Sequence, residues 1–169
     1  MTIRASANTD AAAIANIYNF YILNSTVSFE EEPVSCEEMA HRIADVTTSS
    51  LPWLVAEVDN QIIGYAYATK WKARTAYKYS VEISVYLDHA HIGKGIGTKL
   101  YSALFETLKI TRVNAVIGGI ALPNPASIAL HEAFGMEKVA HFKRIGYKFG
   151  KWIDVAYWQK ELNINAAYN

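Results

Sequence analysis

The segment Gly93-Lys94-Gly95-Ile96-Gly97-Thr98 lies between a clear strand pattern and a clear helix pattern. Its three glycines allow the backbone to pass close to a ligand and to adopt conformations closed to other residues. The helix that follows offers unpaired N–H groups and a positive dipole end, which suit a phosphate or pyrophosphate. Lys94 and Thr98 add a charge and a hydroxyl group. The segment predicts an anion-binding turn; the alternative is a glycine turn that holds no ligand.

Two nucleotide-binding motifs match this turn poorly. A P-loop requires G-x-x-x-x-G-K-[ST], and no Lys-Ser or Lys-Thr follows the last glycine here. A dinucleotide-binding turn requires G-x-G-x-x-G with an acidic residue about 20 positions later. The spacing here is G-x-G-x-G, and Val113 stands near the position of the acidic partner. A nucleotide-dependent enzyme is therefore a distant alternative.

Strand and helix patterns extend in both directions from the turn. In residues 79–87 the apolar side chains from Val81 to Leu87 point to one face, and Glu82, Ser84 and Tyr86 point to the other. Helical spacing follows the turn as far as Leu108. Other strands are expected at 3–6, 53–58, 61–69, 113–122, 138–145 and 153–162, and other helices around 14–22, after Ser35 and after Asn124. This order predicts an α/β (α+β) fold with helices packed on a single mixed sheet.

Local signals mark several ends of these elements. Thr9 or Asp10 is expected to cap the first helix, and Ser35 with Glu38 has the spacing of a capping box. Asn124 is expected to cap a helix that begins at Pro125. The pair at positions 59–60 predicts a tight hairpin.

Composition limits the classes of function. The chain has 169 residues, which fits one domain over 1–169, and 51% of them are hydrophobic. Its formal net charge is zero, so it has no overall positive electrostatic field that would attract nucleic acid or anionic lipid. A signal-peptide core, a membrane-spanning apolar run and a second cysteine beside Cys36 are all absent, which favours the cytoplasm. His89 and His91 are too few to make a metal site, so no metal is expected.

Several segments resemble one enzyme family. The strand at 81–87 and the turn from His91 to Gly97 resemble the acetyl-coenzyme A signature [Q/R]-x-x-G-x-[G/A] of the GNAT superfamily of N-acetyltransferases. Residues 25–30, 71–77, 122–124, 130–132 and 146–155 resemble its phosphinothricin acetyltransferase branch. Ile92 departs from the signature because Gln or Arg is usual there. This puts a side-chain contact from that position in doubt.

The resemblance implies a mixed, mostly antiparallel sheet flanked by about four helices, with acetyl-CoA as co-substrate. The strand at 79–87 would splay from the strand at 113–122, so that backbone groups of Val85 and Leu87 pair with the pantetheine arm. The turn would hold the pyrophosphate, and Asn124 would face the reactive end of the cofactor. The expected cofactor-binding residues are Val85, Tyr86, Leu87, Gly93, Lys94, Gly95, Ile96, Gly97, Thr98 and Asn124.

Acetyl transfer to an amine requires a base, a group that polarises the thioester carbonyl and an acid for the leaving thiolate. Glu82 is the candidate base because it is the acid of an otherwise apolar strand; the alternative is a sheet-surface carboxylate paired with Lys or Arg. A backbone N–H near Val85 is the candidate polariser. His131, where the branch has a histidine, either orients the substrate, relays a proton or packs. The chain has eleven tyrosines, and the sequence singles out none as the acid.

Four further residues are expected to bind the substrate. Lys72 and Arg74 precede the strand at 79–87, where a cation would bind the carboxylate of an amino acid; solvated loop cations are the alternative. Phe29 and Glu30 are expected to line the pocket.

The expected activity is N-acetylation of the α-amino group of a small amino acid or analogue, of the phosphinothricin or methionine sulfoximine kind. The resemblance also implies a homodimer. The alternatives are an acetyltransferase for a polyamine, an antibiotic or a protein N-terminus, or a non-catalytic acyl-CoA binding or sensing module.

Overall fold

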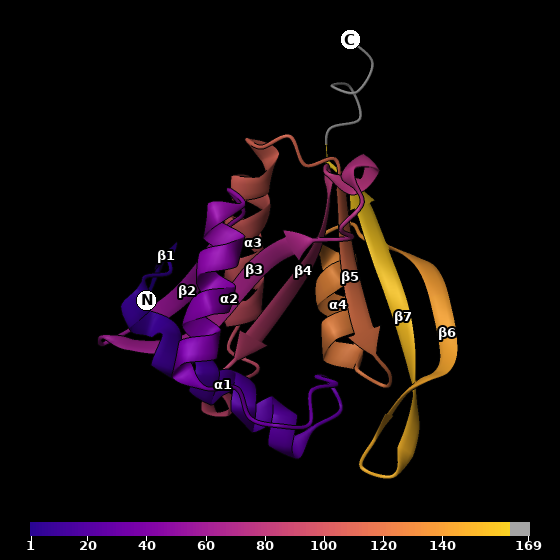
Figure 1. Cartoon of the computed structure of the whole chain (residues 1–169), viewed down its shortest axis with the longest axis horizontal. Helices are drawn as coiled ribbons and strands as arrows, with labels where there is room; N and C mark the ends of the chain where they lie inside the picture. The colour runs from indigo at the N-terminus through magenta and orange to yellow at the C-terminus, as the bar shows by residue number, and fades with distance from the viewer. Residues whose placement is uncertain (163–169) are drawn as a thin grey trace.

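A seven-stranded sheet runs through the protein (Figure 1), whose computed structural model describes residues 1–162. The strands are β1 (Thr2–Ala5), β2 (Trp53–Val58), β3 (Gln61–Lys70), β4 (Ser80–Leu87), β5 (Ala115–Ala121), β6 (Glu137–Lys148) and β7 (Lys151–Glu161). Their order in the sheet is β1-β2-β3-β4-β5-β7-β6. The β4–β5 pair is parallel, and the other neighbouring strands in this order are antiparallel.

Helices cover both faces of the sheet (Figure 1). The four α-helices of the described residues are α1 (Ala11–Asn24), α2 (Cys36–Thr48), α3 (Ile96–Lys109) and α4 (Pro125–Ala133). Short 3₁₀ turns, which the sequence patterns did not predict, occupy Asn8–Asp10, Thr75–Tyr77 and His89–His91. One core lies between α3 and the sheet, with Leu104 fully buried in it, and the other lies between α1, α2 and the opposite face, with Ile14 fully buried.

The observed architecture confirms the predicted fold class and order of strands and α-helices. The predicted hairpin turn is confirmed, because Asp59 and Asn60 both have positive φ angles, 50° and 61°. Ser35 caps α2 by accepting from the Glu38 N–H, 3.0 Å away. Asp10 is the N-cap residue of α1, as predicted, but its carboxylate makes no cap hydrogen bond to that helix: it accepts from the Ala7 N–H and pairs with Arg4. The predicted domain extends to residue 169, and its last residues, 163–169, lie outside the described residues.

Strands β4 and β5 diverge along their length, as the resemblance implied. Their pairing begins at Ser80 opposite Ala115 and ends at Glu82 opposite Ile117. Figure 1 shows the two strands close together at one end and apart at the other. The second half of β4 therefore has a hydrogen-bonded neighbour only on its β3 side.

Candidate active site

The splay between β4 and β5 opens a cavity of about 400 Å³. Residues 83–87 form one wall and residues 119–121 the other, while the glycine turn and the start of α4 close its ends. Ile83 belongs to the core beside α3, whereas Tyr86 packs against the core beside α1. Since both line the cavity, it passes between the strands from one face of the sheet to the other.

The free edge of β4 presents alternate backbone groups to this cavity. The Asp88 N–H donates to the Ile63 carbonyl on β3, and the Tyr79 carbonyl accepts from Ala115 on β5. Because the hydrogen-bonding direction alternates along a strand, odd-numbered residues of β4 direct their backbone groups toward β5. Val85 and Leu87, past the end of the β5 pairing, therefore face the open side with their N–H and C=O groups. The Leu87 carbonyl already accepts from the Tyr21 hydroxyl, at 2.6 Å. The N–H and C=O of Val85 are therefore more available to a ligand than those of Leu87.

The glycine turn has the backbone geometry of an anion-binding site. Gly93 and Gly95 have φ angles of +79° and +73°, which disfavour other residues. A Cβ atom on either would meet no protein atom within 4 Å, so the turn borders open space. Gly95 directly precedes α3, whose first N–H groups lack intrahelical acceptors. These N–H groups and the Thr98 side chain at the cavity wall can hold a pyrophosphate.

Not every predicted cofactor residue turns its side chain toward the cavity. Lys94 donates from Nζ to the Ala90 carbonyl, 2.9 Å away, and Ile96 is buried in the core, so any contact from these two must come from the backbone. Asn124 lines the cavity, but its Oδ1 accepts from the Ser127 N–H, at 3.1 Å, and so caps α4 as predicted. Ile92 is exposed at the cavity rim, which leaves the pyrophosphate to the backbone.

Glu82 lies where β4 and β5 begin to separate. A Cβ atom on Gly119, a wall residue, would lie 3.0 Å from Glu82 Oε1, so the absence of a side chain there leaves room for the carboxylate. Glu82 is half-buried and makes no hydrogen bond or ion pair to any residue in 1–162. Burial raises the pKa of Glu82, and the positive charge of Lys72 partly opposes that rise. An unpaired carboxylate with a raised pKa has the properties of a general base.

On the other face of the sheet, His131 and Tyr101 form a buried pair at the cavity wall. His131 Nδ1 lies 2.7 Å from the Ser127 carbonyl, which can only accept, so the ring proton resides on Nδ1. Nε2 is then an acceptor for the Tyr101 hydroxyl, 3.1 Å away. Burial lowers the pKa of His131 and raises that of Tyr101, so both are neutral near pH 7. A Cβ atom on Gly118 would overlap the His131 ring, so glycine at 118 makes room for this pair.

Comparisons with known proteins agree with this geometry. Residues 3–157 match the family model described as an acetyltransferase (GNAT) domain. The chain belongs to the GNAT acetyltransferase family. This confirms the family and the class of enzyme that the sequence motifs indicated.

Individual relatives of this GNAT chain support the predicted branch. It is 40% identical over 164 residues to the phosphinothricin N-acetyltransferase of Streptomyces viridochromogenes, covering 97% of this chain and 89% of that one. It is 35% identical to the L-methionine sulfoximine/L-methionine sulfone acetyltransferase of Salmonella typhimurium, covering 99% and 98%. The crystal structure of a GNAT superfamily phosphinothricin acetyltransferase from Sinorhizobium meliloti in complex with acetyl-CoA matches with a TM-score of 0.95, at 38% identity, covering 99% and 91%.

Of the two predicted substrate-binding cations, Lys72 lies near the candidate base Glu82. Lys72 is exposed, with Nζ 5.0 Å from the centre of the Trp71 ring, and its charge acts on Glu82. Trp71 packs edge-on against Tyr157 of β7, which in turn borders Gly119. Arg74 is exposed and begins the turn that follows. The structure therefore brings Lys72 near the candidate base, and Arg74 lies two residues further along the same segment.

The loop between α1 and α2 brings Phe29 and Glu30 to the same face of the sheet. Both Glu30 and Glu82 act electrostatically on Tyr67 of β3 and raise its pKa. Glu30 is not a free group, however, because Arg42 binds its carboxylate through two nitrogens, at 2.7 and 3.1 Å, and the Tyr18 hydroxyl donates to it. The assignments of site residues from sequence remain predictions.

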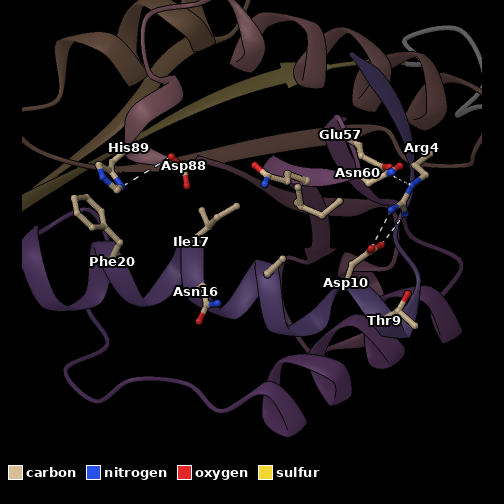
Figure 2. Close-up of a pocket in the computed structure, with 13 residues that line it drawn as sticks. Arg4, Thr9, Asp10, Asn16, Ile17, Phe20, Glu57, Asn60, Asp88 and His89 are labelled. Atoms are coloured by element: carbon tan, nitrogen blue, oxygen red, sulfur yellow. Dashed lines mark hydrogen bonds and ion pairs between the residues drawn. The ribbon is translucent and has the colours of Figure 1, made fainter.

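A second hollow, of about 610 Å³, lies between α1 and the β2–β3 turn (Figure 2). At one end Arg4 pairs with Asp10 and Glu57, at 2.7 and 2.6 Å, and at the other the rings of Phe20 and His89 stack 4.4 Å apart. None of the predicted site residues lines it. Although this hollow is larger, its charged groups are largely paired with one another, so the chemistry of acetyl transfer is concentrated in the β4–β5 splay.

Within residues 1–162 no three or more His, Cys, Asp or Glu side chains gather in a way that would hold a metal ion. Nor does any helix in that range have the length and apolar character needed to cross a membrane.

Proposed function

We propose that this protein transfers the acetyl group of acetyl-CoA to the α-amino group of a small amino acid or amino-acid analogue. The observation that carries the proposal is the splay of β4 from β5. It combines a free strand edge, a glycine turn at the start of α3 and an unpaired carboxylate, Glu82, beside one cavity.

Acetyl-CoA supplies an activated acetyl thioester when it is bound. The backbone N–H groups that begin α3 would hold its pyrophosphate, and the C=O of Val85 and the N–H of Leu87 would pair with the pantetheine arm in the manner of an added strand. The Val85 N–H also polarises the thioester carbonyl, since it points into the cavity from the free edge of β4. Residues 119–121 exclude water from the opposite side of the arm.

Glu82 takes the proton that the substrate ammonium must lose before its nitrogen can attack. It does so at a carboxylate oxygen, directly or through one water. Its raised pKa makes it a stronger base than an ordinary glutamate, and its lack of protein hydrogen bonds leaves both oxygens available.

The Tyr101 hydroxyl is the proton donor that lies on the far side of the sheet from Glu82. Its raised pKa keeps it protonated, and His131 orients it through Nε2. The one O–H of Tyr101 donates to Nε2 before the reaction, so it protonates the sulfur of the leaving thiolate by turning from Nε2 to that sulfur. In this proposal His131 acts through Tyr101 as a positioning residue.

The proposed acceptor is an amino acid because Lys72 offers a cation near Glu82 for a substrate carboxylate, and Arg74, exposed two residues later, offers a second. The names of the relatives, which act on phosphinothricin, methionine sulfoximine and methionine sulfone, support the same class. Phe29 and Glu30 border the acceptor, with Glu30 acting through the Arg42 ion pair that fixes its loop.

The proposal extends to assembly, location and domain organisation. We expect a homodimer because β6, β7 and the turn between them expose six large hydrophobic side chains: Val139, Phe142, Ile145, Tyr147, Phe149 and Trp152. We expect one catalytic domain over residues 1–169, located in the cytoplasm, where the single exposed thiol of Cys36 would stay reduced.

The test is thiol release from acetyl-CoA with a panel of amines. The panel contains L-phosphinothricin, L-methionine sulfoximine, L-methionine sulfone, spermidine and an aminoglycoside. Wild type is compared with Glu82→Gln and with Glu137→Gln, which alters an exposed glutamate at the start of β6.

We expect release with the three amino-acid analogues that falls sharply only in Glu82→Gln. Release with spermidine or the aminoglycoside alone would move the acceptor to another amine class. Acetyl-CoA binding without release for any amine would favour the sensing module instead.

A further inference from the structure

The loop at residues 25–35, here called the acceptor loop, joins α1 to α2 beside the proposed acceptor site. Val27 lines the cavity, and Phe29 and Glu30 follow directly. The loop contains no helix or strand, so contacts with neighbouring elements must hold it in place.

One set of contacts ties the acceptor loop to the helices beneath it. The Tyr18 hydroxyl of α1 lies 2.8 Å from both Ser28 Oγ and Glu30 Oε1. Arg42 of α2 binds the Glu30 carboxylate through two nitrogens. These contacts fix the loop from the α1–α2 side only.

A lysine of β6 holds the loop from the side opposite α1 and α2. Lys148, at the end of β6, is only 2% exposed, and its Nζ donates to the Ser28 carbonyl, 2.7 Å away. This hydrogen bond joins positions 120 residues apart in the sequence. Burial lowers the pKa of Lys148, while the negative charges of Glu31 and Glu30 on the same loop oppose that decrease. The ammonium is thus held by the loop's carbonyl and by its acidic side chains together.

The β6 strand also makes room for the loop two residues earlier. A Cβ atom on Gly146 would lie 2.3 Å from Cε2 of the Phe29 ring, so this ring packs directly on the Gly146 backbone. Lys148 and Gly146 therefore bind consecutive residues of the acceptor loop, Ser28 and Phe29.

We propose that Lys148 is a positioning residue that sets the affinity for the acceptor amine by fixing the acceptor loop against β6. This inference rests on the proposed function for its acceptor site. Lys148 does not line the β4–β5 cavity proposed for the acetyl donor. Its loss should consequently act on the KM of the amine and spare that of acetyl-CoA.

The test compares Lys148→Met with Lys148→Arg and with Lys151→Met, an exposed lysine just across the same β6–β7 turn. For Lys148→Met we expect the KM of the amine to rise about tenfold, the effect of one lost charge-assisted hydrogen bond. The KM of acetyl-CoA should stay within about twofold and kcat within about threefold. Lys148→Arg should recover most of the loss because it keeps a charged donor, and Lys151→Met should match wild type.

A second readout does not depend on the substrate. Glu31 in the loop is an exposed site for a glutamyl endopeptidase, so the rate of cleavage after it reports how firmly the loop is held. We expect faster cleavage in Lys148→Met and no change in Lys151→Met. If wild type acetylates no amino acid, the proposed function fails, and this cleavage rate still decides whether Lys148 holds the loop.

Two results would overturn the inference. One is an unchanged amine KM together with an unchanged cleavage rate in Lys148→Met. The other is an equal rise in both KM values with a lower melting temperature, the pattern of a general structural defect. If Lys148→Met does not fold, Gly146→Ala takes its place, since the added methyl group displaces the Phe29 ring; the same selective rise is expected, and its absence would count against the proposal.

Discussion

Replacing Glu82 by glutamine removes a charge beside the cavity-wall residue Gly119 and almost nothing else. Glutamine has the same shape, and the Glu82 carboxylate has no hydrogen bond or ion pair within residues 1–162 that the substitution would break. The proton acceptor is nevertheless lost. A general base typically contributes about 10²–10⁴-fold to a rate, so we expect kcat to fall at least about a hundredfold, or about 2.7 kcal/mol.

The same substitution should not destabilise the fold. Because burial raises the pKa of Glu82 in the folded protein, its charge weakens the folded state at every pH above the pKa of an ordinary glutamate. Glutamine removes that cost, so the melting temperature near neutral pH should be equal or higher. The difference should disappear below the ordinary glutamate pKa, where both side chains are uncharged.

The assay is the pH dependence of kcat/KM by thiol release, with thermal melts on the same samples. In wild type, kcat/KM should decline on the acid side with an apparent pKa above that of an ordinary glutamate. Lys72→Met should move this decline to higher pH, because the lysine charge lowers the pKa of Glu82. A Glu82→Gln variant that keeps wild-type kcat and the same acid limb would refute the assignment of the base.

Three other substitutions test neighbouring parts of the structure. Tyr101→Phe removes the hydroxyl that His131 orients, and we expect kcat to fall about tenfold or more with little change in the KM of acetyl-CoA, measured by steady-state kinetics. Gly118→Ala places a methyl group 2.3 Å from His131 Nε2, and should lower the free energy of unfolding by about 1–3 kcal/mol in urea titrations. Leu104→Ala empties a fully buried site in the core beside α3, and the same titration should show a loss of about 2–5 kcal/mol.

Local patterns were sufficient to predict most of the fold. The strict alternation in residues 79–87 gave β4 and its two faces, because a half-buried strand exposes its side chains in turn to two different layers. Ser35 and Asn124 were recognised as caps because a cap depends on residues three positions away. The Asp10 carboxylate is the opposite case: it pairs with Arg4, whose guanidinium also binds Glu57, and a helix-cap pattern carries no information on that distant partner.

The candidate site shows the same contrast between residues set by local sequence and residues set by distant contacts. The glycine turn and Glu82 could be proposed from sequence because their chemistry lies within one strand–turn–helix segment. Tyr101 could not be singled out among eleven tyrosines, since its contact with His131 spans 30 positions and depends on the packing of α3 against α4. Lys148 was missed for the same reason, and a lysine near the end of a strand carries no local sign of being buried.

The most direct test of the central claim is the identity of the amine product. L-phosphinothricin is incubated with acetyl-CoA and the wild-type protein, and the product is analysed by mass spectrometry and NMR. We predict one added acetyl group, located on the α-nitrogen, and a strongly reduced yield with Glu82→Gln. Unmodified L-phosphinothricin and amino-acid analogues, recovered from a protein that binds acetyl-CoA in the β4–β5 splay, would contradict acetyl transfer to an amino acid.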